Sequence, residues 1–127
     1  MSEKFTPLVA SALEVIKEEY PYLDGIDSLA QRFSVSSAHL VREFSRQVGI
    51  SPGKYLSMVR LREARAYLLT GEYSVETVAQ LCGYSCGNYF CKVFRKSVGI
   101  SPKAYMLQNI SSRKSPDAPS ADKTPFV

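Results

Sequence analysis

The chain has 127 residues, of which 45% are hydrophobic, 11% aromatic and 22% charged, a balance typical of one folded domain or two small ones. It contains no apolar run long enough to span a membrane, and no signal peptide. Its three unevenly spaced cysteines argue against a disulfide framework. We therefore expect a cytoplasmic protein. The net charge is +4, but residues 1–24 carry −3 and residues 25–107 carry +6, which favours a polyanionic partner for the middle of the chain.

Apolar residues recur at helical spacing along the chain, and no segment alternates as a strand would. Caps, prolines and glycines divide this pattern into seven expected helices, over 7–20, 26–33, 37–48, 52–69, 75–82, 86–98 and 102–108. The expected N-caps are Thr6, Ser36, Ser51, Ser85 and Ser101, and the expected stops are Gly49, Gly71, Gly83 and Gly99. Residues 109–127 are rich in serine, proline and charge and are expected to be disordered. The sequence therefore predicts an all-α fold.

An internal repeat is the strongest pattern in the sequence. Residues 48–52 and residues 98–102 both read Val-Gly-Ile-Ser-Pro, at an offset of 50. Further matches at an offset of 49 or 50 pair Ala30 with Ala79, Gln31 with Gln80, Ser36 with Ser85, Phe44 with Phe94 and Tyr55 with Tyr105. Each copy reads as a short helix, a tight turn and a longer basic helix, which is the layout of a helix-turn-helix. The alternative is a duplicated helical bundle that binds no nucleic acid.

The repeat predicts the organisation of the chain. We expect an N-terminal segment over 1–24 whose helix packs on the first unit, a first helix-turn-helix over 25–50, a linker helix over 51–71, a second helix-turn-helix over 72–108 and the tail over 109–127. A linker helix of about 18 residues is roughly 27 Å long, close to the ~34 Å between successive major-groove windows. One chain could therefore read an asymmetric site that spans about two turns of DNA.

Two motifs resemble the DNA-binding domain of the AraC/XylS family of bacterial transcription regulators. They are Leu29-Ala30-x5-Ser36-x3-Leu40-x3-Phe44-x4-Gly49-x-Ser51-Pro52 and Val78-Ala79-x3-Gly83-Tyr84-x4-Tyr89-Phe90-x3-Phe94-x4-Gly99-x-Ser101-Pro102-x2-Tyr105. The resemblance covers roughly residues 6–108. It implies seven helices in two helix-turn-helix units, sequence-specific binding of double-stranded DNA near the nucleoid, RNA polymerase as a further partner, and an effector domain if the parent chain is longer.

The resemblance also places the residues that contact DNA. Base-facing positions fall on Ala38, Val41, Arg42, Gly87, Asn88, Cys91 and Lys92. Contacts to the DNA backbone are expected from Ser36, Ser37, His39, Arg46, Ser85, Arg95 and Lys96. The guanidinium of Arg42 and the ammonium of Lys92 suit the O6 and N7 edge of guanine, whereas Asn88 suits adenine. For each residue the alternative is a solvated surface position.

Other functional classes find little support in the sequence. It has no phosphate-cradling glycine loop and no acidic pair in a plausible cleft, so we expect no enzyme and no cofactor. The lone His39 and the spacing of the cysteines match no metal site. We expect Cys82 in the core. Cys86 and Cys91 lie on the second reading helix, where Gly87 replaces a more usual polar residue, and a cysteine-based redox sensor or a protein-interaction module is the alternative function.

Overall fold

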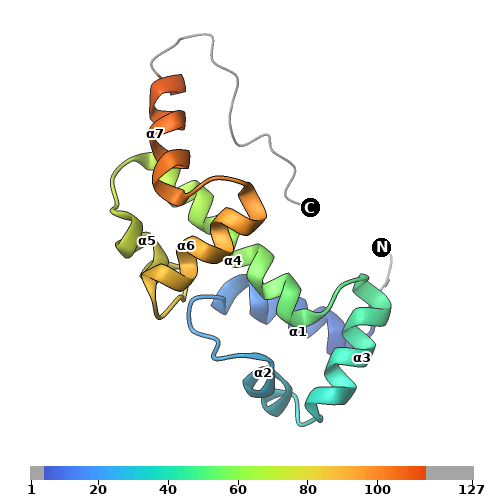
Figure 1. Ribbon diagram of the computed structural model, residues 1–127. Coiled ribbons are helices and arrows are strands. Elements are labelled where there is room, and N and C mark those ends of the chain that lie inside the picture. The colour runs from blue at the N-terminus through green and yellow to red at the C-terminus, as the bar shows by residue number, and fades with distance from the viewer. Residues whose placement is uncertain (1–4, 114–127) are drawn as a thin grey trace. The chain divides into compact units, whose positions relative to one another are not determined.

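The computed structural model describes residues 5–113, with side chains to Asn109, and these residues form seven helices and no strand (Figure 1). The helices are α1 (Pro7–Glu19), α2 (Ile26–Arg32), α3 (Ser37–Val48), α4 (Pro52–Thr70), α5 (Val75–Leu81), α6 (Gly87–Val98) and α7 (Pro102–Arg113). The predicted all-α class is confirmed. None of these helices combines the length and the apolar character that a membrane crossing requires.

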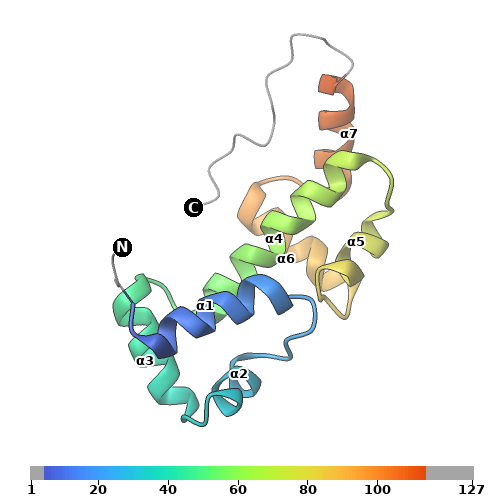
Figure 2. The ribbon, with the colours of Figure 1, turned by 180° about the vertical axis from the view of Figure 1, so that it is seen from behind.

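The chain divides into two compact units, and the division falls inside α4, between Val59 and Arg60. In the first unit, α1 and α2 both pack against α3, and Figure 2 shows the N-terminal end of α1 next to α3. Ile16 of α1, Leu29 of α2 and Phe44 of α3 are fully buried in one shared core. Burying a side chain of this size contributes ~1.5–3 kcal/mol, so the apolar faces account for the packing of these short helices.

The second unit is held together by a row of aromatic rings. The ring of Phe90 lies 5.0 Å from that of Tyr84 and 5.7 Å from that of Phe94, centroid to centroid. Phe94 in turn meets Tyr105 of α7 at 5.5 Å. Phe90 and Phe94 are fully buried, as predicted for the core face of α6. The row therefore fixes α6 between α5 and α7, with which it makes its main contacts.

The sequence repeat is a repeat of structure. Gly49 and Gly99 end α3 and α6 with φ of 100° and 101°, a left-handed conformation that a glycine adopts without steric cost. The hydroxyls of Ser51 and Ser101 then each accept a hydrogen bond, of 3.1 Å, from the main-chain N–H three residues later. Each copy thus stops a reading helix with glycine and begins the next helix with a serine cap, which explains the identical glycine and serine of the two copies.

The C-terminal helix is longer than predicted. It was expected to end near Gln108, but α7 continues to Arg113, so residues 109–113 of the predicted disordered tail are helical. Asn109 is buried, and its side-chain amide donates a 2.7 Å hydrogen bond to the main-chain oxygen of Tyr105. Asn109 therefore belongs to a packed helix and not to the tail that the polar composition suggested. Residues 114–127 of that prediction lie outside the described residues.

Candidate nucleic-acid interface

The first reading helix, α3, has one buried face and one exposed face. Leu40 and Phe44 are fully buried, as predicted. The three predicted base-facing residues lie on the surface at positions three and four apart along the helix, and they are Ala38, Val41 and Arg42. Val41 is one of the few large apolar side chains exposed among the described residues, at 37% of its surface. An exposed valine on this face is suited to a thymine methyl group.

The start of α3 is capped as the sequence predicted. The hydroxyl of Ser36 accepts a 3.0 Å hydrogen bond from the main-chain N–H of His39. The guanidinium of Arg42 lies one turn further on, with Nη2 3.5 Å from Nδ1 of His39. Among the described residues Arg42 has no carboxylate partner, so its charge remains available to a ligand.

Two predicted contacts to the DNA backbone are engaged within the protein. Arg46 forms an ion pair with Glu43 on the same helix, and the hydrogen bond from Arg46 is the main reason why the pKa of Glu43 is lowered. The hydroxyl of Ser37 donates a hydrogen bond to Oδ1 of Asp27 on α2. The spacing of Glu43 and Arg46 could have indicated the first contact. No local pattern links Ser37 to Asp27, ten residues earlier.

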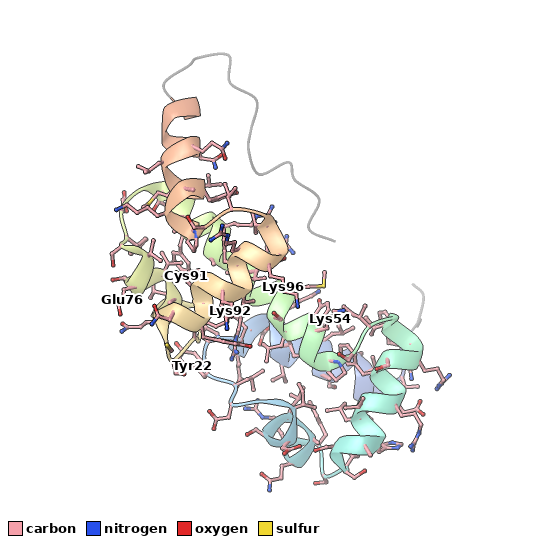
Figure 3. All side chains as sticks on the ribbon, in the orientation of Figure 1. Tyr22, Lys54, Glu76, Cys91, Lys92 and Lys96 are labelled. Atoms are coloured by element: carbon pink, nitrogen blue, oxygen red, sulfur yellow. The ribbon has the colours of Figure 1, made fainter. Side chains whose placement is uncertain are left out.

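The second reading helix, α6, is richer in uncompensated positive charge. Asn88 and Lys92 are exposed on the predicted base-facing side, whereas Cys91 is partly buried. Lys92, Arg95 and Lys96 are all exposed and have no carboxylate partner in the described part of the chain. Figure 3 shows Lys92 and Lys96 projecting from α6, with Glu76 on the neighbouring helix α5.

The cap of α6 differs from the prediction. Ser85 was expected to cap this helix, but α6 begins at Gly87, the N-cap is Cys86, and the Cys86 side chain makes no capping hydrogen bond. The offset between the copies changes from 49 to 50 within this turn, so Cys86, and not Ser85, stands where Ser36 stands in the first copy. A thiol is a weak acceptor, which explains why the cap is lost. Ser85 is exposed in the turn before the helix.

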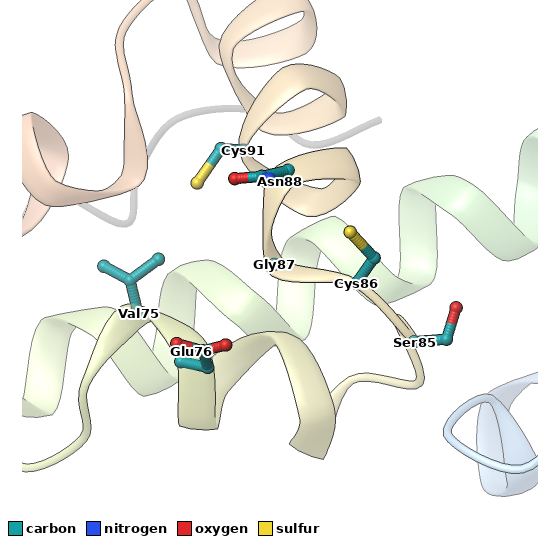
Figure 4. A pocket seen from close by; sticks show the side chains of 7 residues that line it. All are labelled: Val75, Glu76, Ser85, Cys86, Gly87, Asn88 and Cys91. Atoms are coloured by element: carbon teal, nitrogen blue, oxygen red, sulfur yellow. The ribbon is translucent and has the colours of Figure 1, made fainter.

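A pocket of ≈ 420 Å³ opens where α5 meets the start of α6 (Figure 4). Its lining includes three of the predicted base-facing residues together with both accessible cysteines, and it consists of Val75, Glu76, Ser85, Cys86, Gly87, Asn88 and Cys91. Glu76 was not among the residues predicted from the sequence. The repeat could have indicated it, because Glu76 is the second residue of α5 as Asp27 is the second residue of α2.

The three cysteines occupy different environments. Cys82 is fully buried, as predicted, and burial raises the pKa of its thiol to about 12, with Glu63 adding to the rise and Arg60 opposing it. Cys86 is exposed and Cys91 is intermediate, and both are free thiols. Cys82 therefore stays protonated, whereas the other two lie at the surface of the pocket.

Comparison with known proteins agrees with this geometry. The sequence profile of the helix-turn-helix domain family matches residues 29–108. The HTH-type transcriptional activator RhaS of Pectobacterium carotovorum subsp. carotovorum (strain PC1) is 39% identical over 84 residues, which cover 66% of this chain and 30% of the relative. The chain thus spans less than a third of the length of this relative, and the same holds for RhaS of Escherichia coli O139:H28, of which it covers 28%.

Solved structures share the arrangement of helices. A transcriptional regulator with an AraC-type DNA-binding domain from Chromobacterium violaceum matches with a TM-score of 0.71 at 27% identity, over 81% of this chain and 92% of that one. The DNA-binding domain of AdpA, a global transcriptional factor solved with a target DNA, matches with a TM-score of 0.78 at 27% identity, over 87% of this chain and 99% of that one. Because the family profile covers more than half of the chain and the helices follow the same plan, the chain belongs to the AraC-type helix-turn-helix domain family.

Proposed function

We propose that this chain binds double-stranded DNA in a sequence-specific manner, as the DNA-binding part of a bacterial transcription activator. The observation that carries the proposal is the repeated design of α3 and α6. Each helix buries a phenylalanine face in its own unit and exposes a face with polar or basic side chains. A helix of this kind, the second of a helix-turn-helix, is the element that enters a major groove.

In this proposal the two reading helices make different contacts with DNA. On α3, the uncompensated Arg42 reads guanine, while Ala38 and Val41 offer apolar contact to thymine methyl groups. On α6, Asn88 and Lys92 read bases, and Arg95 and Lys96 neutralise phosphates. Ser36 and the partly buried His39 lie at the start of α3, where phosphate oxygens are favoured, and Ser85 lies in the exposed turn before α6.

The partners of the whole protein follow from the same proposal. RhaS relatives are named as transcriptional activators, and the chain covers under a third of their length. We therefore propose that an effector part belongs to the parent protein, that RNA polymerase is a further partner, and that the protein acts in the bacterial cytoplasm, where the DNA lies.

Selection of duplexes from a random library by the purified chain tests the proposal. We expect a motif of two unlike boxes with centres about one helical turn apart. Binding to the selected duplex should then weaken steeply as salt rises, with a slope of log affinity against log salt close to −0.9 for each phosphate neutralised. Replacing Arg95 and Lys96 with alanine should reduce that slope, because both are proposed to neutralise phosphates, whereas Lys17→Ala on α1 should not. A chain that selects no motif and binds no duplex at low salt would contradict the proposal.

A further inference from the structure

Each unit places an acidic side chain against the start of its reading helix. Asp27 is the second residue of α2, and Glu76 is the second residue of α5. In the first unit the carboxylate of Asp27 is engaged, because the hydroxyl of Ser37, the first residue of α3, donates a hydrogen bond to it. The corresponding first residue of α6 is Gly87, which has no side chain to offer.

The carboxylate of Glu76 nevertheless lies against that position. A Cβ atom added to Gly87 would lie 3.7 Å from Oε2 of Glu76, so no other side chain fills the space between them. Glu76 is exposed, and among the described residues it has neither an ion pair nor a hydrogen bond. Figure 4 shows it on the first turn of α5, in the pocket that Asn88 and Cys91 also line. The second unit therefore presents a free hydrogen-bond acceptor beside its base-facing residues.

Few groups on DNA can use such an acceptor. The phosphates are anionic acceptors and repel a carboxylate, so Glu76 cannot serve as a backbone contact. In the major groove the donors are the exocyclic amino groups, N4 of cytosine and N6 of adenine, and carboxylates typically accept from cytosine N4. A carboxylate held at the groove disfavours sequences without a donor more than it strengthens binding, which is a source of specificity.

We propose that Glu76 is a base-reading residue of the second unit, and that it accepts a hydrogen bond from the exocyclic amino group of one base, cytosine in preference to adenine. This inference rests on the proposed DNA-binding function. Gly87 has a defined part in it: the missing side chain leaves Glu76 unpaired, and it leaves the pocket open to the edge of a base.

The first unit supplies the design of a test. Gly87→Ser places at the start of α6 the residue that engages Asp27 at the start of α3, and the added Cβ would make only ordinary contacts. This variant keeps Glu76 but should engage its carboxylate within the protein. Glu76→Ala removes the carboxylate altogether. Glu72→Ala is the matched control, because Glu72 is an exposed acidic residue that does not line the pocket.

The experiment is selection of duplexes by the wild type and the three variants, followed by affinity measurements on single-base changes. The wild type should require cytosine or adenine at one position of the second box. Glu76→Ala and Gly87→Ser should each lose that preference, by on the order of tenfold, and keep the rest of the motif. Glu72→Ala should keep the full motif. Thermal unfolding of each variant checks that the fold is retained.

The outcomes separate this inference from the function on which it rests. If Glu76→Ala binds all sequences more tightly and selects the wild-type motif, Glu76 only repels phosphates and the inference is overturned. If Gly87→Ser keeps a preference that Glu76→Ala loses, the part assigned to Gly87 is overturned. A wild-type chain that selects no motif would instead contradict the proposed DNA-binding function.

Discussion

Arg42 and Arg46 lie one helical turn apart on α3, yet the free protein holds them differently. Arg46 is engaged by Glu43, whereas Arg42 has only the ring nitrogen of His39 nearby. We predict that Arg42→Ala will cost about 1–3 kcal/mol of binding free energy and relax base preference in one box, because it removes a base contact. Arg46→Ala should weaken binding to all sequences alike, and only slightly, because its contact with a phosphate competes with Glu43.

Fluorescence titration of the selected duplex and of single-base variants measures both effects. Glu43→Gln is the matched control, since it releases Arg46 and should tighten binding to every sequence. Equal losses and an unchanged selected motif for Arg42→Ala and Arg46→Ala would show that the faces of α3 are assigned wrongly.

At the scale of the helices, the two reading helices begin in different ways. Ser36 caps α3 through its hydroxyl, but Cys86 stands at the equivalent position of α6 and makes no capping bond. We predict that Ser36→Ala will lower the free energy of unfolding by about 1 kcal/mol, the usual cost of losing a serine cap. Ser85→Ala should leave it almost unchanged, because Ser85 is an exposed turn residue. Urea unfolding measures the free energy of unfolding of both variants. An equal decrease in the two variants would contradict the assignment of the caps.

A salt bridge joins α1 to α2 and makes a small contribution to stability that depends on pH. Arg32 donates two hydrogen bonds, of 2.9 and 2.8 Å, to the carboxylate of Glu19, and they lower the pKa of Glu19 from its ordinary value of 4.5. A carboxyl group with a lowered pKa stabilises the fold above pH 4.5, and this contribution is lost as the pH falls through the folded-state pKa.

We therefore predict that Glu19→Gln will lower the urea midpoint at pH 7 and have a smaller effect near pH 3. The effect at pH 7 should be small, because both side chains are partly exposed to solvent, which screens the pair. Glu18→Gln removes a neighbouring charge from the same helix and should show a smaller difference between the two pH values. The same dependence on pH for both variants would contradict a role for this salt bridge.

The sequence predicted the helices where the pattern was local and periodic. The buried faces of α3 and α6 followed from the spacing of Leu40, Phe44, Phe90 and Phe94, and the glycine stops followed from the left-handed conformation they permit. The prediction failed for α7, because the burial of Asn109 depends on packing, and for the cap of α6, because an inserted residue changed the register of the repeat. Of the candidate interface, exposure could be predicted, but the hydrogen bond from Ser37 to Asp27 could not, since it joins two different helices.

At the scale of the whole molecule, the repeat supplies two reading helices in one polypeptide. A protein with one helix-turn-helix generally needs a dimer to read two half-sites. Because this chain carries α3 and α6 in separate compact units, we predict that one chain will bind one asymmetric site. Native mass spectrometry of the complex on a single selected site should give one chain per duplex. Two chains bound obligately to a palindrome would rule out this stoichiometry while leaving the two reading helices in place.

Chemical modification of the buried thiol of Cys82 can report local opening of the second unit. All three cysteines of the chain lie beyond Arg60, where the second unit begins. Cys82 is the buried one, and its pKa is raised to about 12. In a chain with Cys86→Ser and Cys91→Ser, a thiol reagent can modify the protein only when this unit opens. The rate of modification would then report how often the second unit opens, with no dye or tag added and no signal from the first unit.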